Sequence, residues 1–127
     1  MVGAIAVAGV TVARASARAE IATVVVTIHY SHFSPSSFSF AAGATVRFVI
    51  RNTDPIDHEF ILGDRTIQIE HEHGTQRYHV ASPGIVSVPA GSTRVTTYTF
   101  GAPGPSIIGC HLPGHYAYGM RAPVTVT

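Results

Sequence analysis

The residues best suited to chemistry lie together near the C-terminus. Cys110, His115 and Met120 follow one another at equal intervals and supply a thiol, an imidazole and a thioether. Sulfur and imidazole are the ligand types that suit copper in its two oxidation states, with methionine as a weak axial donor. The spacing therefore predicts a copper site, and a trigonal site of this kind needs a second histidine.

His58 is the obvious supplier of that second imidazole. It follows the turn-forming cluster Asn-Thr-Asp-Pro at 52–55 and begins a short stretch with strand character. If this strand lies beside the strand that ends at Cys110, both side chains emerge at the same end of the sheet. The Pro-Gly pair at 113–114 then turns the chain so that His115 returns to the metal.

Composition limits the alternatives. The 127 residues are enough for one domain, and the charged share of 12% is about half of the usual ~25%, which excludes a disordered tail and a coiled coil. All eight basic residues are arginines, the formal net charge is +1, and no basic stripe stands out, which argues against a nucleic-acid partner. The single cysteine excludes an intramolecular disulfide, and eight histidines indicate a metal.

The N-terminus is best set apart from the fold. Residues 2–13 form an uncharged, mostly apolar run that is too short to span a bilayer, which needs about 20 residues. Two small-x-small steps follow, at 15–17 and 17–19, although no basic residue precedes the run. We expect residues 1–19 to be a signal peptide or a flexible leader, residues 20–127 to be one exported domain, periplasmic or extracellular, and no stable membrane span.

From Thr23 onward the chain reads as short strands. Alternating apolar residues, many of them β-branched, are separated by Pro, Gly and Asn-Asp punctuation. The pattern predicts an all-β sandwich of about seven or eight strands. The clearest candidates cover residues 23–28, 44–52, 58–62, 85–88, 93–100, 106–111 and 123–127.

Residues 64–79 are ambiguous, and we expect a loop with a short strand or a helical turn. If the segment is extended, His71 and His73 share one face and can chelate a second metal ion, assisted by His79 and neighbouring acids. If it is helical, the two histidines point in different directions. A solvated polar loop is the competing interpretation.

The chain from about residue 23 to residue 127 resembles the cupredoxins, the small blue copper proteins. The resemblance is greatest to exported cupredoxin-like copper-binding proteins. It implies a Greek-key β-sandwich and one copper ion held by four ligands, His58, Cys110, His115 and Met120. It rests on Phe33-Ser34-Pro35, the strand ending at Asn52, His58-Glu59-Phe60 and the Cys110-His111-Leu112-Pro113-Gly114-His115 loop.

Two residues depart from the family pattern. Electron-transfer cupredoxins commonly have Asn after the first histidine ligand, where it ties the ligand loops together, whereas this chain has Glu59. This carboxylate can lower the copper potential, hold a ligand loop or point into solvent. His111 follows Cys110, but Gly109 precedes it, so the paired histidines that bind further copper in multicopper oxidases are incomplete. We expect His111 to face solvent or a partner.

The resemblance implies a binding protein, not an enzyme, that passes electrons by outer-sphere transfer to a redox partner protein. His115 would be the exit, and Leu112, Pro113 and Tyr116 the docking patch. A second hypothesis is copper buffering or delivery to a copper-exchanging protein, which the acid- and His-rich segment favours. A third is a catalytic copper domain related to nitrite reductases or multicopper oxidases, against which the single cysteine argues.

Overall fold

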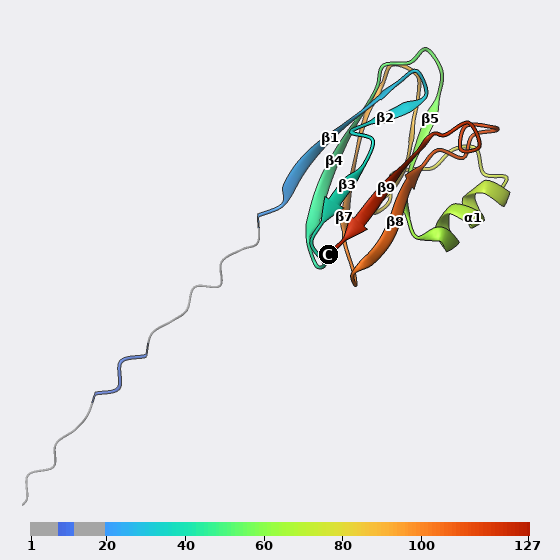
Figure 1. Cartoon of the computed structure of the whole chain (residues 1–127). Coiled ribbons are helices and arrows are strands. Elements are labelled where there is room, and N and C mark those ends of the chain that lie inside the picture. The colour runs from blue at the N-terminus through green and yellow to red at the C-terminus, as the bar shows by residue number, and fades with distance from the viewer. Residues whose placement is uncertain (1–7, 12–19) are drawn as a thin grey trace, which may run out of the picture.

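The fold is a sandwich of two β-sheets (Figure 1). The computed structural model describes residues 8–11 and 20–127, so the predicted leader at 1–19 lies outside the described residues apart from 8–11. One sheet has four strands in the order β2-β1-β4-β7, and the other has five in the order β3-β9-β8-β5-β6. The chain passes repeatedly from one sheet to the other. The predicted all-β sandwich is confirmed.

All seven stretches that the sequence predicts as strands form strands, with small shifts at their ends. The structure adds two strands of three residues each, so the described residues contain nine strands where about seven or eight were predicted. Elements this short carry too little alternation to be recognised. The elements are β1 (Ala22–His29), β2 (His32–Ser34), β3 (Phe38–Phe40), β4 (Thr45–Asn52), β5 (His58–Gly63), α1 (Arg65–His73), β6 (Ile85–Val88), β7 (Thr93–Thr99), β8 (Gly104–Gly109) and β9 (Arg121–Val126).

The core fills the space between the sheets. On β4 the side chains of Val46, Phe48 and Ile50 are buried, and those of Arg47 and Arg51 are exposed, as the alternation predicts. Aromatic rings from both sheets meet at this layer, and the Phe48 ring lies 5.2 Å from that of Phe60 on β5. Cys110 and Met120 belong to the same buried cluster, so the candidate ligands are continuous with the core.

The pairing of β5 with β8 positions the candidate site. The two strands are antiparallel, with Ile61 opposite Gly109 and Gly63 opposite Ile107. Because the strands run in opposite directions, His58 at the start of β5 lies at the same end of the sheet as Cys110, which directly follows β8. The expectation that these two residues emerge together is confirmed.

Residues 65–73 form a nine-residue helix, which is longer than the helical turn that the sequence allowed as one alternative within a loop. Asp64 caps the helix, because its side chain accepts the N–H of Ile67. The residues that face the protein are Ile67, the buried Gln68 and His71, whereas Ile69 is exposed. Since a polar side chain occupies the inward face, apolar spacing gave no helical signal. Within the described residues, no helix is long and apolar enough to cross a bilayer.

Asn52, at the end of β4, fixes the loop that leads to His58. Its buried amide nitrogen donates to the carbonyls of Ile56 and Val88 at 2.8 and 2.9 Å, and its carbonyl oxygen accepts the N–H of Asp54 at 2.9 Å. The side chain thus satisfies backbone groups from two segments that are far apart in the sequence. The loop conformation depends on this one amide.

We predict that Asn52→Ala lowers the free energy of unfolding by about 2–3 kcal/mol, because it leaves several buried backbone groups without partners. The control is Gln76→Ala, which removes an exposed amide that makes one hydrogen bond, to the Tyr78 carbonyl. Its cost should be about 0.5 kcal/mol or less. Urea denaturation of the metal-free protein measures both values, and equal losses would contradict the assignment.

Candidate metal centre

Three candidate ligand atoms converge at one end of the sandwich. The Nδ1 atoms of His58 and His115 lie 3.2 Å apart, and the Cys110 Sγ atom lies 3.3 Å from His115 Nδ1 and 4.0 Å from His58 Nδ1. Among the residues that the structure describes, these three form the group whose ligand atoms could hold one metal ion. The sequence-predicted histidines and cysteine are therefore brought together.

The loop from Cys110 to Met120 carries three of the four predicted residues and is closed by its own backbone. Cys110 N–H donates to the Met120 carbonyl at 3.1 Å, and Met120 N–H donates to the His115 carbonyl at 3.0 Å. Gly114 has a φ of +84°, a conformation that other residues rarely adopt, and this turns the chain back toward the site. The predicted Pro-Gly turn thus has the expected effect on His115.

The site is buried except at His115. Cys110, His58 and Met120 are almost completely inaccessible, whereas His115 is partly exposed. Burial raises the pKa of the Cys110 thiol to about 12, so the metal-free protein holds a protonated thiol at neutral pH. A metal ion that binds here must displace this proton, because only the thiolate is a ligand.

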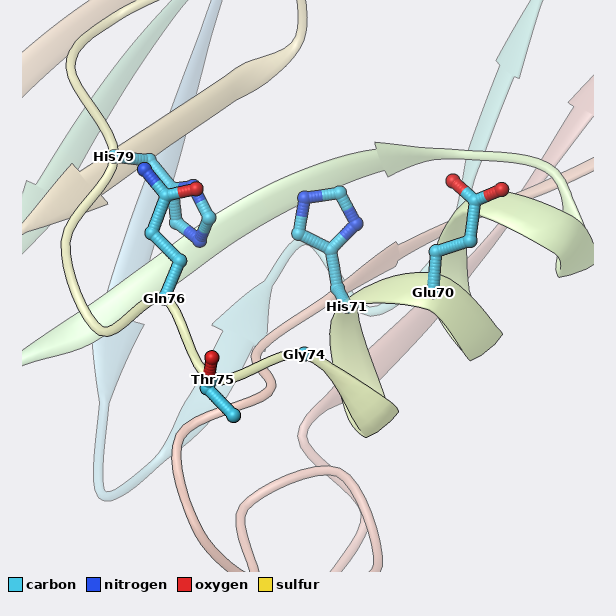
Figure 2. A pocket seen from close by; sticks show the side chains of 6 residues that line it. All are labelled: Glu70, His71, Gly74, Thr75, Gln76 and His79. Carbon is cyan, nitrogen blue, oxygen red and sulfur yellow. The ribbon is translucent and has the colours of Figure 1, made fainter.

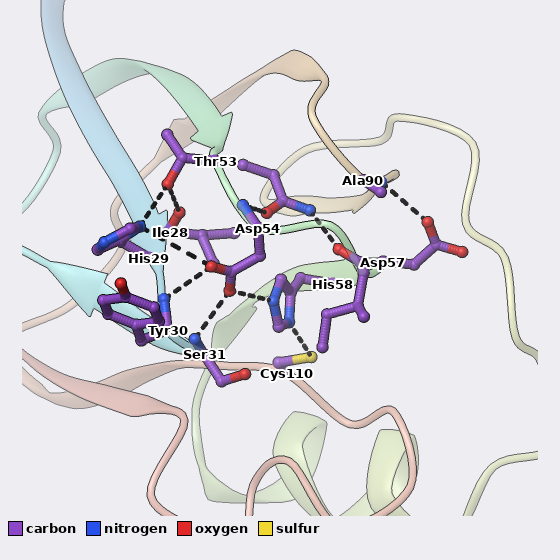
Figure 3. Close-up of polar contacts among 12 residues, drawn as sticks. Ile28, His29, Tyr30, Ser31, Thr53, Asp54, Asp57, His58, Ala90 and Cys110 are labelled. Atoms are coloured by element: carbon purple, nitrogen blue, oxygen red, sulfur yellow. Dashed lines mark hydrogen bonds and ion pairs between the residues drawn. The ribbon is translucent and has the colours of Figure 1, made fainter.

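Asp54 orients the first histidine (Figure 3). Its carboxylate lies 2.8 Å from His58 Nε2 and also accepts the backbone N–H groups of Tyr30 and Ser31 at 2.7 and 2.8 Å. Although burial opposes ionisation, the donors from Ser31, His58 and Tyr30 hold the pKa of Asp54 below its usual value. Burial also lowers the pKa of His58, which keeps the imidazole neutral.

The protonation of His58 follows from this contact. A carboxylate only accepts hydrogen bonds, so the His58 proton is on Nε2 and donates to Asp54. The lone pair is then on Nδ1, the nitrogen that faces Cys110 and His115. Metal-binding histidines are typically held in this way by a carboxylate on the other ring nitrogen.

The spacing of the three atoms fits a first-row metal ion. With metal–nitrogen bonds of about 2.0 Å and a metal–sulfur bond of about 2.3 Å, an ion at the centre of a planar set holds its donors about 3.5–3.7 Å apart. The observed separations of the donor atoms, 3.2, 3.3 and 4.0 Å, lie on either side of these values. One thiolate and two imidazoles are donor types that favour copper, and the buried Met120 at the end of the same loop carries a thioether.

Glu59 ties the two ligand segments together. Its backbone N–H donates to Cys110 Sγ at 3.3 Å, and its Oε1 accepts the N–H of His111 at 2.9 Å. Its Oε2 lies 3.0 Å from His79 Nε2, and the whole side chain is buried. Of the three roles open to this residue, pointing into solvent is excluded, and holding a ligand loop is what the contacts describe.

The sequence predicted that His111 faces solvent or a partner, but this prediction is wrong. Its side chain is almost fully buried against α1, with Nε2 close to Gln68 Oε1 and Nδ1 close to Glu72 Oε2, both at 2.6 Å. The ring also stacks on Tyr116, with centroids 4.6 Å apart. The expectation assumed a strand continuing through His111, but β8 ends at Gly109 and the chain then turns under the helix.

The suggested pairing of His71 with His73 is also wrong. Both lie on α1, and two residues along a helix point in different directions. His71 instead lies near His79, which comes from the segment after the helix, with ring centroids 5.2 Å apart. His73 is exposed.

Two residues that position the site were not singled out from the sequence. Asp54 was taken only as part of a turn, although its place four residues before His58 is a usable signal for a carboxylate–histidine contact. Gln68 gave no signal, because its partners come from other strands. Its amide nitrogen donates to the carbonyls of Ile61 and Ile107, on β5 and β8, and its oxygen meets His111.

The proteins that this chain resembles include copper proteins, in agreement with the donor set of this centre. Residues 11–127 match the family model described as multicopper oxidase. The copper-resistant cuproprotein CopI of Rubrivivax gelatinosus is 32% identical over 114 residues, which cover 87% of this chain and 69% of that protein. Among solved structures, the reduced auracyanin of Roseiflexus castenholzii has a TM-score of 0.70 at 21% identity, covering 83% of this chain and 96% of that chain. Auracyanin A, a blue copper protein of Chloroflexus aurantiacus, has a TM-score of 0.66 at 20% identity, covering 85% and 100%.

The two auracyanins show that this chain shares their fold. The CopI relative and the family model show that it belongs to the same protein family. The family match covers most of the described residues, including every residue of the candidate centre. Together with the cysteine and two histidines that converge in the structure, these matches identify the bound metal as copper. This chain is a cupredoxin-like, copper-binding member of the multicopper oxidase family and a relative of CopI.

Proposed function

We propose that the chain holds one copper ion in a type 1 site and passes single electrons by outer-sphere transfer. In this proposal His58, Cys110 and His115 are the strong ligands, and Met120 is the weak axial ligand. The observation that carries the proposal is the preformed triangle of donor atoms, separated by 3.2–4.0 Å and buried on every side except at His115. Copper bound there supplies a one-electron couple between Cu(I) and Cu(II).

The protein's own contribution is rigidity. Asp54 holds the His58 ring from behind, and the Glu59 N–H fixes the Cys110 sulfur. The loop that carries His115 is closed by backbone hydrogen bonds at both ends. Because these contacts leave the donors little freedom to rearrange, the reorganisation that accompanies a change of charge stays small, which favours rapid electron transfer.

The partly exposed His115 is the proposed route for the electron. Leu112 packs partly against the core beside it, and Tyr118, in the same loop, is 90% exposed. Tyr116, which the sequence assigned to a docking patch, lies instead against His111. We infer that a redox partner protein docks on the surface around His115, and that this happens outside the cytoplasm, as the leader-like pattern of residues 1–19 suggests.

Copper handling is the second candidate function. The relative from Rubrivivax gelatinosus is named a copper-resistant cuproprotein, and a histidine- and acid-rich segment surrounds α1 in this chain. Buffering or delivery uses the same ligands, but copper rather than an electron is exchanged. A catalytic role like that of an oxidase is less well supported, since both ring nitrogens of His111 are engaged by Gln68 and Glu72.

We predict that Cu(II) gives the wild-type protein an intense visible absorption and that Cys110→Ser abolishes it, because no other thiolate is present to supply the charge transfer. Met120→Leu is the matched control. It also changes a buried residue of the loop, yet it should keep the colour and raise the reduction potential, since loss of the axial donor disfavours Cu(II). Absorption spectra and voltammetry measure both effects. Colourless Cu(II) binding by the wild type would contradict a type 1 site.

We predict that Glu59→Gln keeps the colour and raises the reduction potential by tens of millivolts. The variant retains an acceptor for the His111 N–H but removes a buried negative charge that stabilises Cu(II). The control is Glu72→Gln, whose carboxylate is 43% exposed and therefore better screened, so that its shift should be smaller. An unchanged or lower potential in Glu59→Gln would show that this charge does not act on the copper.

Electron transfer and copper handling predict opposite orders for two rates, the rate of electron exchange and the rate of copper loss. We expect electron self-exchange between copper-loaded molecules to be much faster than the loss of Cu(I) to a strong chelator. NMR line broadening measures the self-exchange rate. Tyr118→Glu should slow self-exchange by about tenfold at low salt, since it places like charges at the proposed contact. Val95→Glu, on β7 in the other sheet, should leave the rate unchanged. Loss of copper faster than electron exchange would favour copper handling.

A further inference from the structure

A second pair of imidazoles faces a pocket outside the candidate centre. The pocket has a volume of about 220 Å³ and is lined by the end of α1 and the segment that follows it (Figure 2). His71 reaches it from the helix and His79 from the chain beyond, with ring centroids 5.2 Å apart. Glu70, Thr75 and Gln76 belong to the same lining.

Each of these histidines has one ring nitrogen committed elsewhere. His71 Nδ1 lies 2.8 Å from the carbonyl of Ile67, and a carbonyl only accepts, so this nitrogen carries the proton. His79 Nε2 lies 3.0 Å from the Glu59 carboxylate. In the neutral rings, His71 Nε2 and His79 Nδ1 therefore keep their lone pairs. A carbonyl or carboxylate behind each imidazole is the arrangement that supports histidine ligands of metals.

We infer that the pocket between His71 and His79 is a second metal site, which takes Cu(II) on two imidazoles. Imidazole nitrogens bind Cu(II) more tightly than the other divalent first-row ions, and with metal–nitrogen bonds of about 2.0 Å a single ion can contact rings that lie this close. The pocket leaves the remaining positions to water or to oxygen donors of its lining. Without a thiolate ligand, this copper is colourless beside the first one.

This second site is separate from the first but connected to it. Glu59 meets His79 through its side chain, whereas its backbone N–H meets the Cys110 sulfur. The inference does not depend on electron transfer or on the type of the first site, since it rests on His71, His79 and their own partners. A protein that handles copper gains a second, more accessible place to hold the ion.

The test is a calorimetric titration of the full chain with Cu(II), after one equivalent has filled the first site. We expect a second equivalent to bind, with an electron paramagnetic resonance signal that lacks the thiolate signature. His71→Gln and His79→Gln should each weaken this second event by about tenfold or more. The matched control is His73→Gln, which removes an exposed histidine two residues from His71 that does not line the pocket. It should change the affinity less than twofold, because this side chain does not reach the proposed ion.

The inference fails if the wild type takes up one copper only, or if His73→Gln weakens the second event as much as His71→Gln does. The absorption of the first site reports whether each variant is folded. His71 is half-buried on the helix surface, so its variant carries the test should His79→Gln disturb the contact with Glu59. A wild type that lacks the intense absorption but still binds copper at His71 and His79 would overturn the proposed type 1 site and support this one.

Discussion

The carboxylate of Asp54 accepts hydrogen bonds from three N–H groups that belong to two separate parts of the chain. Two are the backbone groups of Tyr30 and Ser31 in the turn between β1 and β2, and the third is the imidazole of His58. Both turn residues have positive φ values, 48° and 57°, which are uncommon outside glycine. The buried charge therefore stabilises a strained turn in one sheet and orients a ligand in the other. Its burial is tolerated because both carboxylate oxygens accept hydrogen bonds.

The cysteine and the segment that follows it depend on a comparable carboxylate, that of Glu59. Glu59 joins the two ligand segments, through its backbone N–H to the Cys110 sulfur and through its side chain to the His111 N–H. A buried carboxylate costs more to desolvate than an amide and needs more partners. His79 provides the additional one, which brings the segment after α1 into the organisation of the centre.

Below the ligand loop, α1 covers the end of β8. Gln68 and His111 meet there. Gly109 leaves the space that Gln68 and Tyr116 occupy, since a Cβ atom at this position would lie 2.6 Å from Gln68 Oε1 and 2.9 Å from the Tyr116 ring. Any larger residue at position 109 would have to displace the Gln68 amide and the Tyr116 ring. The helix thus seals the inner side of the loop, whereas its last turn opens toward the pocket between His71 and His79.

The sequence by itself determined the longer strands and the order of the predicted ligands, but not the three-residue strands β2 and β3. Alternation on β4 predicted its buried face, because a strand of period two next to a core must place Val46, Phe48 and Ile50 on one side. Cys110, His115 and Met120 were recognisable because a single loop carries them all. His58 followed from a turn and the strand after it. Only the tertiary structure decided which polar residues are buried. Glu59, Gln68 and His111 are satisfied by donors and acceptors from distant segments, as is Asp54 apart from its local contact with His58, and no local pattern encodes partners that lie far away in the sequence.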